Sequence, residues 1–415
     1  MKINFTLFTT LFLLTLSSNA QFSAEGEFRP RAEYRNGYGN LILEDQEPGF
    51  GISTRARLNF GYKSEGYNLF VSLQDVIVWG ENRQLLPEDK NNTFAIFQAW
   101  ADLKLGSNMM IKLGRQEISY DDQRIMGGLD WAQQGRNHDA AILKYNKDKF
   151  TFDLGLAFNQ DYDNISGFQS VGNMYNTTGF FSYKTMQYAY LKNSWNSFSG
   201  SLLLLNNGFQ ETDNLSYLQT IGTHLNYKKG KFGASANVFL QSGKRQGEVD
   251  VKGAYLASLD FSYKTSEKIT LELGAEIISG NNKNAGETGA FFPLYGTNHK
   301  FNGFMDYFYV GNHANTIGLI DVHASLNIYL NKDTNLLIKA LNFSGEQALP
   351  NGEKSLGTEV DLVYSKKFKG YSLVAGYSQM FASDGMYELK GVSENLASYS
   401  QNWAWVMLVI KPKFL

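Results

Sequence analysis

The chain has 415 residues, of which 43% are hydrophobic, 14% aromatic and 19% charged, with 40 Gly, 6 Pro, no Cys and a formal net charge of -2. The balanced charge gives no indication of nucleic-acid binding, and the low Pro content and moderate charge exclude a disordered chain. The absence of Cys excludes disulfides, thiolate catalysis and metal sites built on Cys.

Residues 1–20 have the three parts of an export signal. Lys2 supplies a positive charge, residues 5–16 form an apolar core, and the SNA sequence at 18–20 is a small-residue cleavage site. The core is too short to span a bilayer as a helix, which takes about 20 apolar residues. We therefore expect a cleaved signal peptide at 1–20 and a single mature domain at 21–415.

The mature chain alternates between two kinds of residue with the period of a β-strand. In its first segment every odd position from 25 to 35 is charged, while the even positions are apolar, small or aromatic. The same alternation recurs at 52–63, 93–105 and 356–365. No uninterrupted apolar run long enough for a membrane helix follows the signal, so a helical membrane protein is excluded. We expect an all-β protein.

The phase of the alternation changes in one place. In 93–105 the alternation is regular and puts Phe97 on the apolar face. In 109–118 the apolar residue Leu113 instead falls on the same face as the charged residues Arg115 and Glu117. This change of phase requires either a β-bulge or a strand that leaves the lipid zone at Arg115.

Connection lengths separate an outer-membrane barrel, which has lipid outside and a polar interior, from a soluble sandwich. We expect tight turns near 64–66, 106–108, 147–149, 193–195, 228–231, 265–267, 331–333 and 367–370. We expect long polar connections near 36–50, 80–92, 119–137, 161–177, 209–215, 244–252, 281–315, 345–354 and 384–397. Eight turns and nine loops join eighteen strands, an even number as bacterial barrels require. The sequence therefore predicts a transmembrane antiparallel up-and-down β-barrel of about 18 strands.

Aromatic residues flank most of the expected tight turns, as in the girdles that mark a membrane interface. The pairs are Tyr62 and Tyr67, Tyr145 and Phe150, Tyr227 and Phe232, and Phe368 and Tyr371. They support a barrel embedded in the lipid bilayer of the bacterial outer membrane.

The segment 113–139 (LGRQEISYDDQRIMGGLDWAQQGRNHD) resembles the signature of the alginate export family of outer-membrane β-barrel porins. Segments 291–307, 356–381 and 401–414 resemble further blocks of the same family. The resemblance implies an 18-stranded barrel with a narrow, Arg-rich constriction. Through this constriction an anionic polysaccharide or a similar solute would pass by diffusion.

Arginine is concentrated at one end of the chain, since nine of the ten lie within the first 136 residues. Its guanidinium group is planar and permanently charged, which suits binding of a carboxylate-bearing solute. Charged side chains of this kind set the selectivity of pores. We expect the solute to meet the following pore-lining residues: Arg29, Arg31, Arg55, Arg57, Arg115, Glu117, Arg124, Asp130, Arg136, Asp139, His299, Lys300 and Asp306. The alternative is that the arginines pair with Glu25, Glu27 and Glu33 and only fill a hydrated interior.

Two loops are candidates for narrowing the pore. The segment 119–137 carries several charges, with Gly127 and Gly128 allowing a tight turn and Trp131 as a packing anchor, and we expect it to fold into the lumen. The segment 281–315 is a second candidate.

The predicted function is an outer-membrane channel for the passive, selective diffusion of anionic or sugar-like solutes such as alginate-type polysaccharides or oligosaccharides. A barrel with a plugged lumen that binds or adheres through its loops remains the alternative, and a secreted soluble β protein is a third interpretation. We expect no enzyme, cofactor or metal, because the five His lack metal-ligand spacing. The expected partners are the bilayer, the solute and the barrel-assembly machinery, with no nucleic acid.

Overall fold

The computed structural model describes residues 21–81, 93–159, 183–211, 214–282, 284–308, 313 and 316–415. The predicted signal peptide at 1–20 lies outside these residues, as do the predicted connection near 161–177 and most of the one near 80–92.

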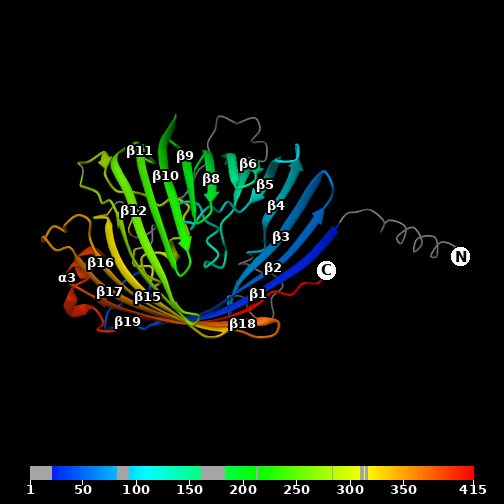
Figure 1. Cartoon of the computed structure of the whole chain (residues 1–415). Coiled ribbons are helices and arrows are strands. Elements are labelled where there is room, and N and C mark those ends of the chain that lie inside the picture. The colour runs from blue at the N-terminus through cyan, green and yellow to red at the C-terminus, as the bar shows by residue number, and fades with distance from the viewer. Residues whose placement is uncertain are drawn as a thin grey trace, which may run out of the picture.

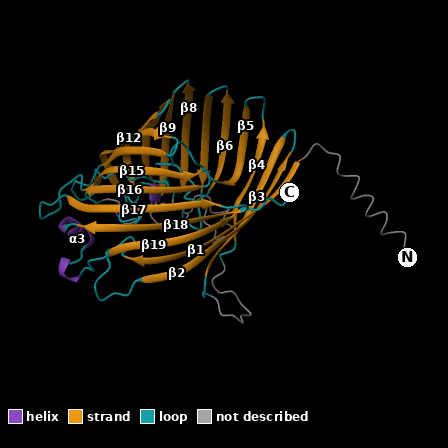
Figure 2. Cartoon of the chain, turned by 60° about the horizontal axis from the view of Figure 1, so that its bottom comes forward, coloured by secondary structure: helices purple, strands orange, loops and turns teal. Residues whose placement is uncertain are grey.

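One antiparallel sheet forms the wall of the protein. Its first half consists of β1 (Gln21–Asn36), β2 (Gly49–Lys63), β3 (Tyr67–Val78), β4 (Ala95–Lys104), β5 (Met109–Gln116), β6 (His138–Lys147), β7 (Phe150–Phe158), β8 (Thr185–Trp195) and β9 (Phe198–Gln210). Its second half consists of β10 (Leu215–Lys229), β11 (Phe232–Arg245), β12 (Val249–Ser266), β13 (Ile269–Ile278), β15 (Leu319–Asn331), β16 (Thr334–Ser344), β17 (Ser355–Lys367), β18 (Tyr371–Ala382) and β19 (Gln401–Ile410). The sheet closes because β1 pairs with both β2 and β19 (Figures 1 and 2).

The remaining elements belong to connections between the strands. The sheet counts 19 strands within the described residues, but β14 (Glu287–Thr288) is a two-residue strand inside a loop, so 18 strands build the wall. The helices are η2 (Asn298–Lys300), α3 (Asp384–Lys390) and η3 (Glu394–Leu396). None of the helices in the described part of the chain is both long and apolar enough to cross a membrane. The prediction of an 18-stranded barrel is confirmed.

The barrel turns its charged face inward and its apolar face outward. On β1 the inward Arg29 is 4% exposed, whereas its outward neighbour Phe28 is 45% exposed. On β2 the corresponding values are 0% for Arg55 and 46% for Leu58. A soluble sandwich would bury the apolar face, so this polarity is that of a barrel surrounded by lipid.

The turns lie close to their predicted positions, and the aromatic residues flanking them are in contact. The ring centroids of Tyr62 and Tyr67 are 5.9 Å apart, and those of Phe368 and Tyr371 are 4.7 Å apart. Two connections predicted to be long, near 209–215 and 244–252, are short. The reason is that β9 to β12 are 13 to 18 residues long and absorb the polar residues that the sequence assigned to loops.

The structure explains the irregular alternation of β4 and β5. A register shift in the pairing of β3 with β4, after Ser72, turns Phe97 inward, where the guanidinium of Arg57 lies 3.8 Å from its ring centroid. The prediction that Phe97 faces outward was therefore wrong. The strand β5 contains no such shift in its pairing with β4 and ends at Gln116, directly after Arg115.

Two loops fold into the barrel, and we call them the inserted segments. They are residues 117–137, between β5 and β6, and residues 290–306, within the connection from β13 to β15. They meet backbone to backbone through a parallel bridge between Met126 and Tyr295. The prediction that 119–137 folds inward is confirmed.

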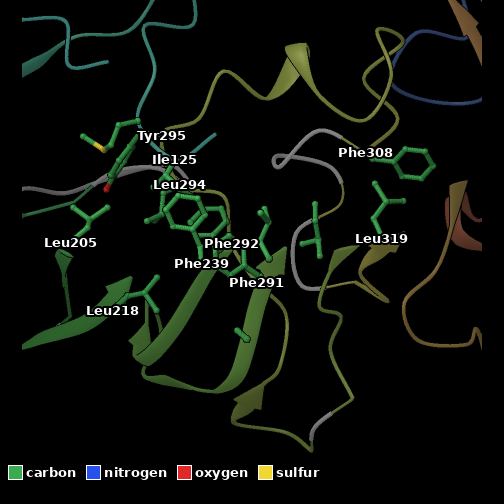
Figure 3. Close-up of a cluster of buried hydrophobic side chains, with 14 of the residues drawn as sticks. Ile125, Leu205, Leu218, Phe239, Phe291, Phe292, Leu294, Tyr295, Phe308 and Leu319 are labelled. Carbon is green, nitrogen blue, oxygen red and sulfur yellow. The ribbon is translucent and has the colours of Figure 1, made fainter. Parts of the chain in front are cut away.

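Apolar side chains anchor the inserted segments. Figure 3 shows Ile125, Phe292 and Leu294 of these segments beside Leu218 of β10 and Phe239 of β11, all within one buried cluster. The barrel interior is therefore not polar throughout. On the side of β9 to β11 it contains a hydrophobic core like that of a soluble domain.

Candidate functional site

Five arginines line the inner face of the first two strands. They are Arg29, Arg31 and Arg35 on β1 and Arg55 and Arg57 on β2, and Arg29 lies directly opposite Arg55 in the ladder. Like charges that face each other across a ladder repel and need counter-charges. Two carboxylates on β1 supply part of that charge: the Nε of Arg55 donates to Glu27 at 3.0 Å, and the Nε of Arg31 donates to Glu33 at 3.1 Å.

The inserted segment 117–137 supplies further acceptors through its backbone. Arg29 donates from Nη1 to the carbonyl of Asp130 at 2.8 Å, and Arg31 donates from Nη1 to the carbonyl of Trp131 at 2.8 Å. Arg57 reaches the carbonyl of Gln134 at 3.4 Å. The arginines therefore act as clamps on this segment as well as forming a basic surface.

One carboxylate of the segment lies among three guanidinium groups. The Oδ1 of Asp130 is 2.7 Å from the Nη2 of Arg55 and 3.9 Å from the Nη1 of Arg57, and its Oδ2 is 3.5 Å from the Nη1 of Arg29. Partial desolvation inside the barrel would by itself raise the pKa of Asp130, but the attraction of Arg55 and Arg29 outweighs it and holds the pKa below its usual range. Asp130 is thus ionised throughout the physiological pH range.

Glu117, at the start of the same segment, has the opposite perturbation. Burial and the nearby charge of Asp130 raise the pKa of Glu117, and the attraction of Arg57 compensates only in part. Glu117 therefore takes up a proton at a higher pH than an ordinary glutamate.

Buried carboxylates line another part of the wall, between β13 and β17. Glu276 of β13, Asp321 of β15, and Glu359 and Asp361 of β17 are each at most 5% exposed and face the inserted segments. Arg124 of the first segment forms a bidentate ion pair with Glu276, with both N–O distances 2.7 Å. The second segment binds the same wall through the backbone N–H of its Met305, which donates to Oε1 of Glu359 at 2.9 Å. The inserted segments thus bridge a basic and an acidic wall.

Two cavities lie on either side of residues 299–306. The first, of about 560 Å³, lies toward the short turns and is lined by acidic and basic side chains, among them Asp260, Lys300 and His323. The second, of about 530 Å³, lies toward the long loops and includes Arg31 and Arg35 in its lining. We call them the turn-side cavity and the loop-side cavity.

A stack of rings borders the loop-side cavity. Trp131 lies between the guanidinium of Arg31, 4.3 Å from its ring centroid, and the imidazole of His299, 4.4 Å away by centroids. The Nδ1 of His299 also forms a hydrogen bond with the carboxylate of Asp306 at 2.9 Å. The hydroxyl of Tyr38 donates to the same carboxylate. These contacts fix the residues that border the cavity.

The structure brings most of the predicted site residues together inside the barrel. Arg29, Arg31, Arg55, Arg57 and Asp130 form the cluster described above, and Glu117 is in electrostatic contact with it. On the second inserted segment, His299 and Asp306 line the loop-side cavity, whereas Lys300 lines the turn-side cavity. Arg136 joins the two segments by donating to the carbonyl of Gly296 at 3.1 Å.

Three predicted site residues are placed elsewhere. Arg115 and Asp139 were expected in the pore but form a bidentate pair with each other, at 2.9 and 3.0 Å, on the outward face shared with Leu113. The alternation continues through β5 without a bulge, and this carries both residues outward. Arg124 is inside the barrel but only 1% exposed, because Glu276, Asn298 and Asn302 enclose it. It therefore lines neither of the two cavities.

Sequence reasoning missed two features of the site, the acidic wall and the loop-side cavity beside the basic wall. Glu272 and Glu276 alternate with apolar residues in β13, and that alternation was a usable signal. Gly49 and Gly51, which help to form the loop-side cavity, gave no signal because a glycine has no side chain to show which face it occupies. Among the described residues, no group of three or more His, Cys, Asp or Glu is arranged to hold a metal ion.

The closed wall, its outward apolar face and the charged interior define an outer-membrane β-barrel of the porin type. The sequence model for alginate export matches residues 21–393, and the chain belongs to that family. The family and the fold are those of channels of the bacterial outer membrane.

Solved structures support the fold. OccAB4 of Acinetobacter baumannii aligns with a TM-score of 0.64 and 13% identity, covering 95% of this chain and 98% of that one. OprD of Pseudomonas aeruginosa aligns with a TM-score of 0.63 and 10% identity, covering 95% and 96%, and OccK5 (OpdH) of the same organism with 0.62 and 10%, covering 95% and 99%. No curated protein sequence matches the chain.

Proposed function

We propose that this protein is a channel for the passive, selective diffusion of small anionic or sugar-like solutes, such as alginate-type oligosaccharides. The observation that carries the proposal is the cluster of Arg29, Arg55 and Arg57, which already holds one carboxylate, that of Asp130. Guanidinium groups bind carboxylates through paired hydrogen bonds and keep their charge at every working pH. The same chemistry is available to a carboxylate carried by a solute.

The route that we assign begins at the loop-side cavity. There Arg31 and Arg35 meet the solute, and the side chain of Arg35 is 47% exposed. The arginine cluster and Asp130 follow on the same wall. We assign pore-lining roles to these residues and to the following: Glu117, Arg136, His299, Lys300 and Asp306. Because the long loops of bacterial barrels are extracellular, this order of sites runs from the cell exterior toward the periplasm.

Planar-bilayer recording of the refolded protein in a salt gradient tests the proposal. We expect an open channel whose reversal potential reports a preference for anions and whose current is reduced by added oligouronate. A closed pore would instead favour the barrel that binds through its loops with a plugged lumen. A cation-selective pore that ignores oligouronate would contradict anion transport.

A pair of arginines of similar exposure supplies the matched variants. Arg35 and Arg115 have side chains 47% and 43% exposed, but Arg35 lies in the loop-side cavity and Arg115 on the outer face. Arg35→Gln should lower the anion preference, whereas Arg115→Gln should leave it unchanged. Equal effects of the two substitutions would count against the assigned route.

We also propose how the protein reaches its membrane. Residues 1–20 direct export and are removed, so that the mature chain begins at Gln21, and the barrel-assembly machinery inserts the strands. N-terminal sequencing of protein extracted from outer membranes tests this, with Gln21 as the expected first residue. A first residue of Met1 would contradict signal removal.

A further inference from the structure

Asp130 differs from its partners in exposure. Its side chain is 69% exposed, whereas the side chains of Arg29, Arg55 and Arg57 are 5%, 0% and 9% exposed. The carboxylate therefore faces the water of the lumen while the guanidinium groups it binds lie behind it. A solute in the lumen meets Asp130 before it meets these arginines.

The three arginines have partners that do not depend on the Asp130 side chain. Arg55 is bound by Glu27, Arg29 donates to the amide oxygen of Gln133 at 2.9 and 3.1 Å, and Arg57 donates to Gln74 at 2.5 Å. Departure of the carboxylate would therefore leave the guanidinium groups in position. It would uncover the Nη2 of Arg55, to which the Oδ1 of Asp130 now lies 2.7 Å away.

The backbone at Asp130 is also held independently of its side chain. Its carbonyl accepts hydrogen bonds from Arg29 at 2.8 Å and from Arg55 at 3.4 Å. The backbone N–H of Arg136 donates to the carbonyl of Gly128 at 2.8 Å and closes the base of the turn that carries Asp130. The carboxylate can thus leave the arginines by rotation of its own side chain, without movement of the inserted segment.

We propose that Asp130 is an internal competitor, a tethered carboxylate that occupies the arginine site between solutes and is exchanged for the carboxylate of each solute that passes. This inference rests on the proposed anion channel and adds to it the residue that sets how long a solute stays. When a solute carboxylate binds Arg55, the displaced Asp130 stays within reach through its tether. It then repels the bound anion and competes for its site.

The physical advantage of such a competitor lies in the rate of release. Conduction needs sites that attract a solute but do not retain it. The cluster of Arg29, Arg55 and Arg57 with Glu27 carries an excess of positive charge in a partly dehydrated place, where attraction to an anion is strong. A neighbouring carboxylate that returns to the arginines shortens the stay of the solute without removing the positive charge that draws it in.

Single-channel recording with sodium glucuronate as the probe tests the inference. We expect Asp130→Asn, which keeps the size of the side chain and removes its charge, to lengthen the residence time of glucuronate about tenfold and to lower its maximal flux. The control is Asp139→Asn, because Asp139 is also an exposed carboxylate paired with an arginine but lies on the outer face. Asp139→Asn should leave both quantities unchanged.

The outcomes separate this inference from the proposed function. If glucuronate blocks the wild type and Asp130→Asn has the same residence time or a shorter one, the channel proposal stands and the competitor is refuted. If glucuronate blocks only Asp130→Asn, Asp130 is a competitor so strong that the wild type does not admit the probe. If neither protein is blocked, both proposals fail. Asp130→Ala, which cannot hydrogen-bond to Arg55, repeats the measurement and should lengthen the residence time at least as much.

Discussion

Arg124 and Glu276 form a bidentate ion pair, with both N–O distances 2.7 Å, that ties the first inserted segment to the far wall of the barrel. The two residues are 152 positions apart in sequence, and both are almost fully buried. The position of the segment within the lumen therefore depends on a contact between a loop and a distant strand.

Replacing Arg124 by Ala should release this end of the segment. Removing one partner of a buried pair typically costs about 3 to 5 kcal/mol, because the other charge remains buried without compensation. We expect a larger single-channel conductance with more frequent transitions between current levels. Arg115→Ala breaks a pair on the outer face, away from the inserted segments, and should leave the current unchanged. Identical currents for wild type and Arg124→Ala would show that the segment does not limit flow.

The anion preference should increase as the pH falls from 7 toward 5. Burial and the nearby charge of Asp130 raise the pKa of Glu117, so Glu117 becomes neutral before ordinary carboxylates do. Asp130 keeps its charge in this range, because its own pKa is lowered by Arg55 and Arg29 despite partial desolvation. The lumen then loses one negative charge beside the arginine cluster. Reversal potentials measured across this range should shift in wild type and shift less in Glu117→Gln, and an equal shift in both would assign the effect to other groups.

Filling the loop-side cavity should hinder conduction without destabilising the barrel. A Cβ at Gly51 would meet no heavy atom within 4 Å, and Gly51 lines that cavity. We expect Gly51→Leu to lower the conductance and to change the free energy of unfolding by no more than about 0.5 kcal/mol. Gly66 in a short turn is equally unhindered and supplies the control Gly66→Leu. A conductance equal to that of the wild type would exclude the cavity from the ion path.

Docking of α3 should strengthen as the pH rises from 7 to 9. Lys390 at the end of this helix donates from Nζ to the carbonyl of Tyr307 at 2.5 Å, and burial lowers its pKa to about 8. An undocked Lys390 with an ordinary pKa binds more protons in this range, so raising the pH favours the docked state, by about 1 kcal/mol between pH 7 and 9. Hydrogen exchange of the α3 amides, corrected for the intrinsic rate, should slow about tenfold. The slowing should be absent in Lys390→Met, and its persistence there would assign the effect to another group.

The strands could be predicted because their signal is local. The alternation of charged and apolar residues within β1 and β2 determines which side chains face the lumen, and the polar breaks between strands fix the turns to within a few residues. The prediction failed where a single residue changes the phase, as at Phe97 beside the register shift of β3 and β4. It failed again where polar residues extend strands, as at the short connection between β11 and β12.

The interior was less predictable from the same pattern. The sequence correctly identified 119–137 as an inserted loop and gathered Arg29, Arg31, Arg55 and Arg57 on one wall. It assigned Arg115 to the pore from its charge and from the closeness of β5 to the first two strands, although the unbroken alternation of β5 turns that side chain outward to Asp139. A charge reveals that a partner is needed, but it does not identify the partner.

The sequence by itself determined the closed barrel, its number of strands and the side of each strand that carries charge, since all three follow from patterns within a few residues and from the spacing of turns. Only the tertiary structure decided which arginines remain open to the lumen. Asp130 meets Arg55 across 75 residues, and Arg124 meets Glu276 across 152. Such pairings depend on where the inserted segments meet the closed wall, and no local pattern records that position.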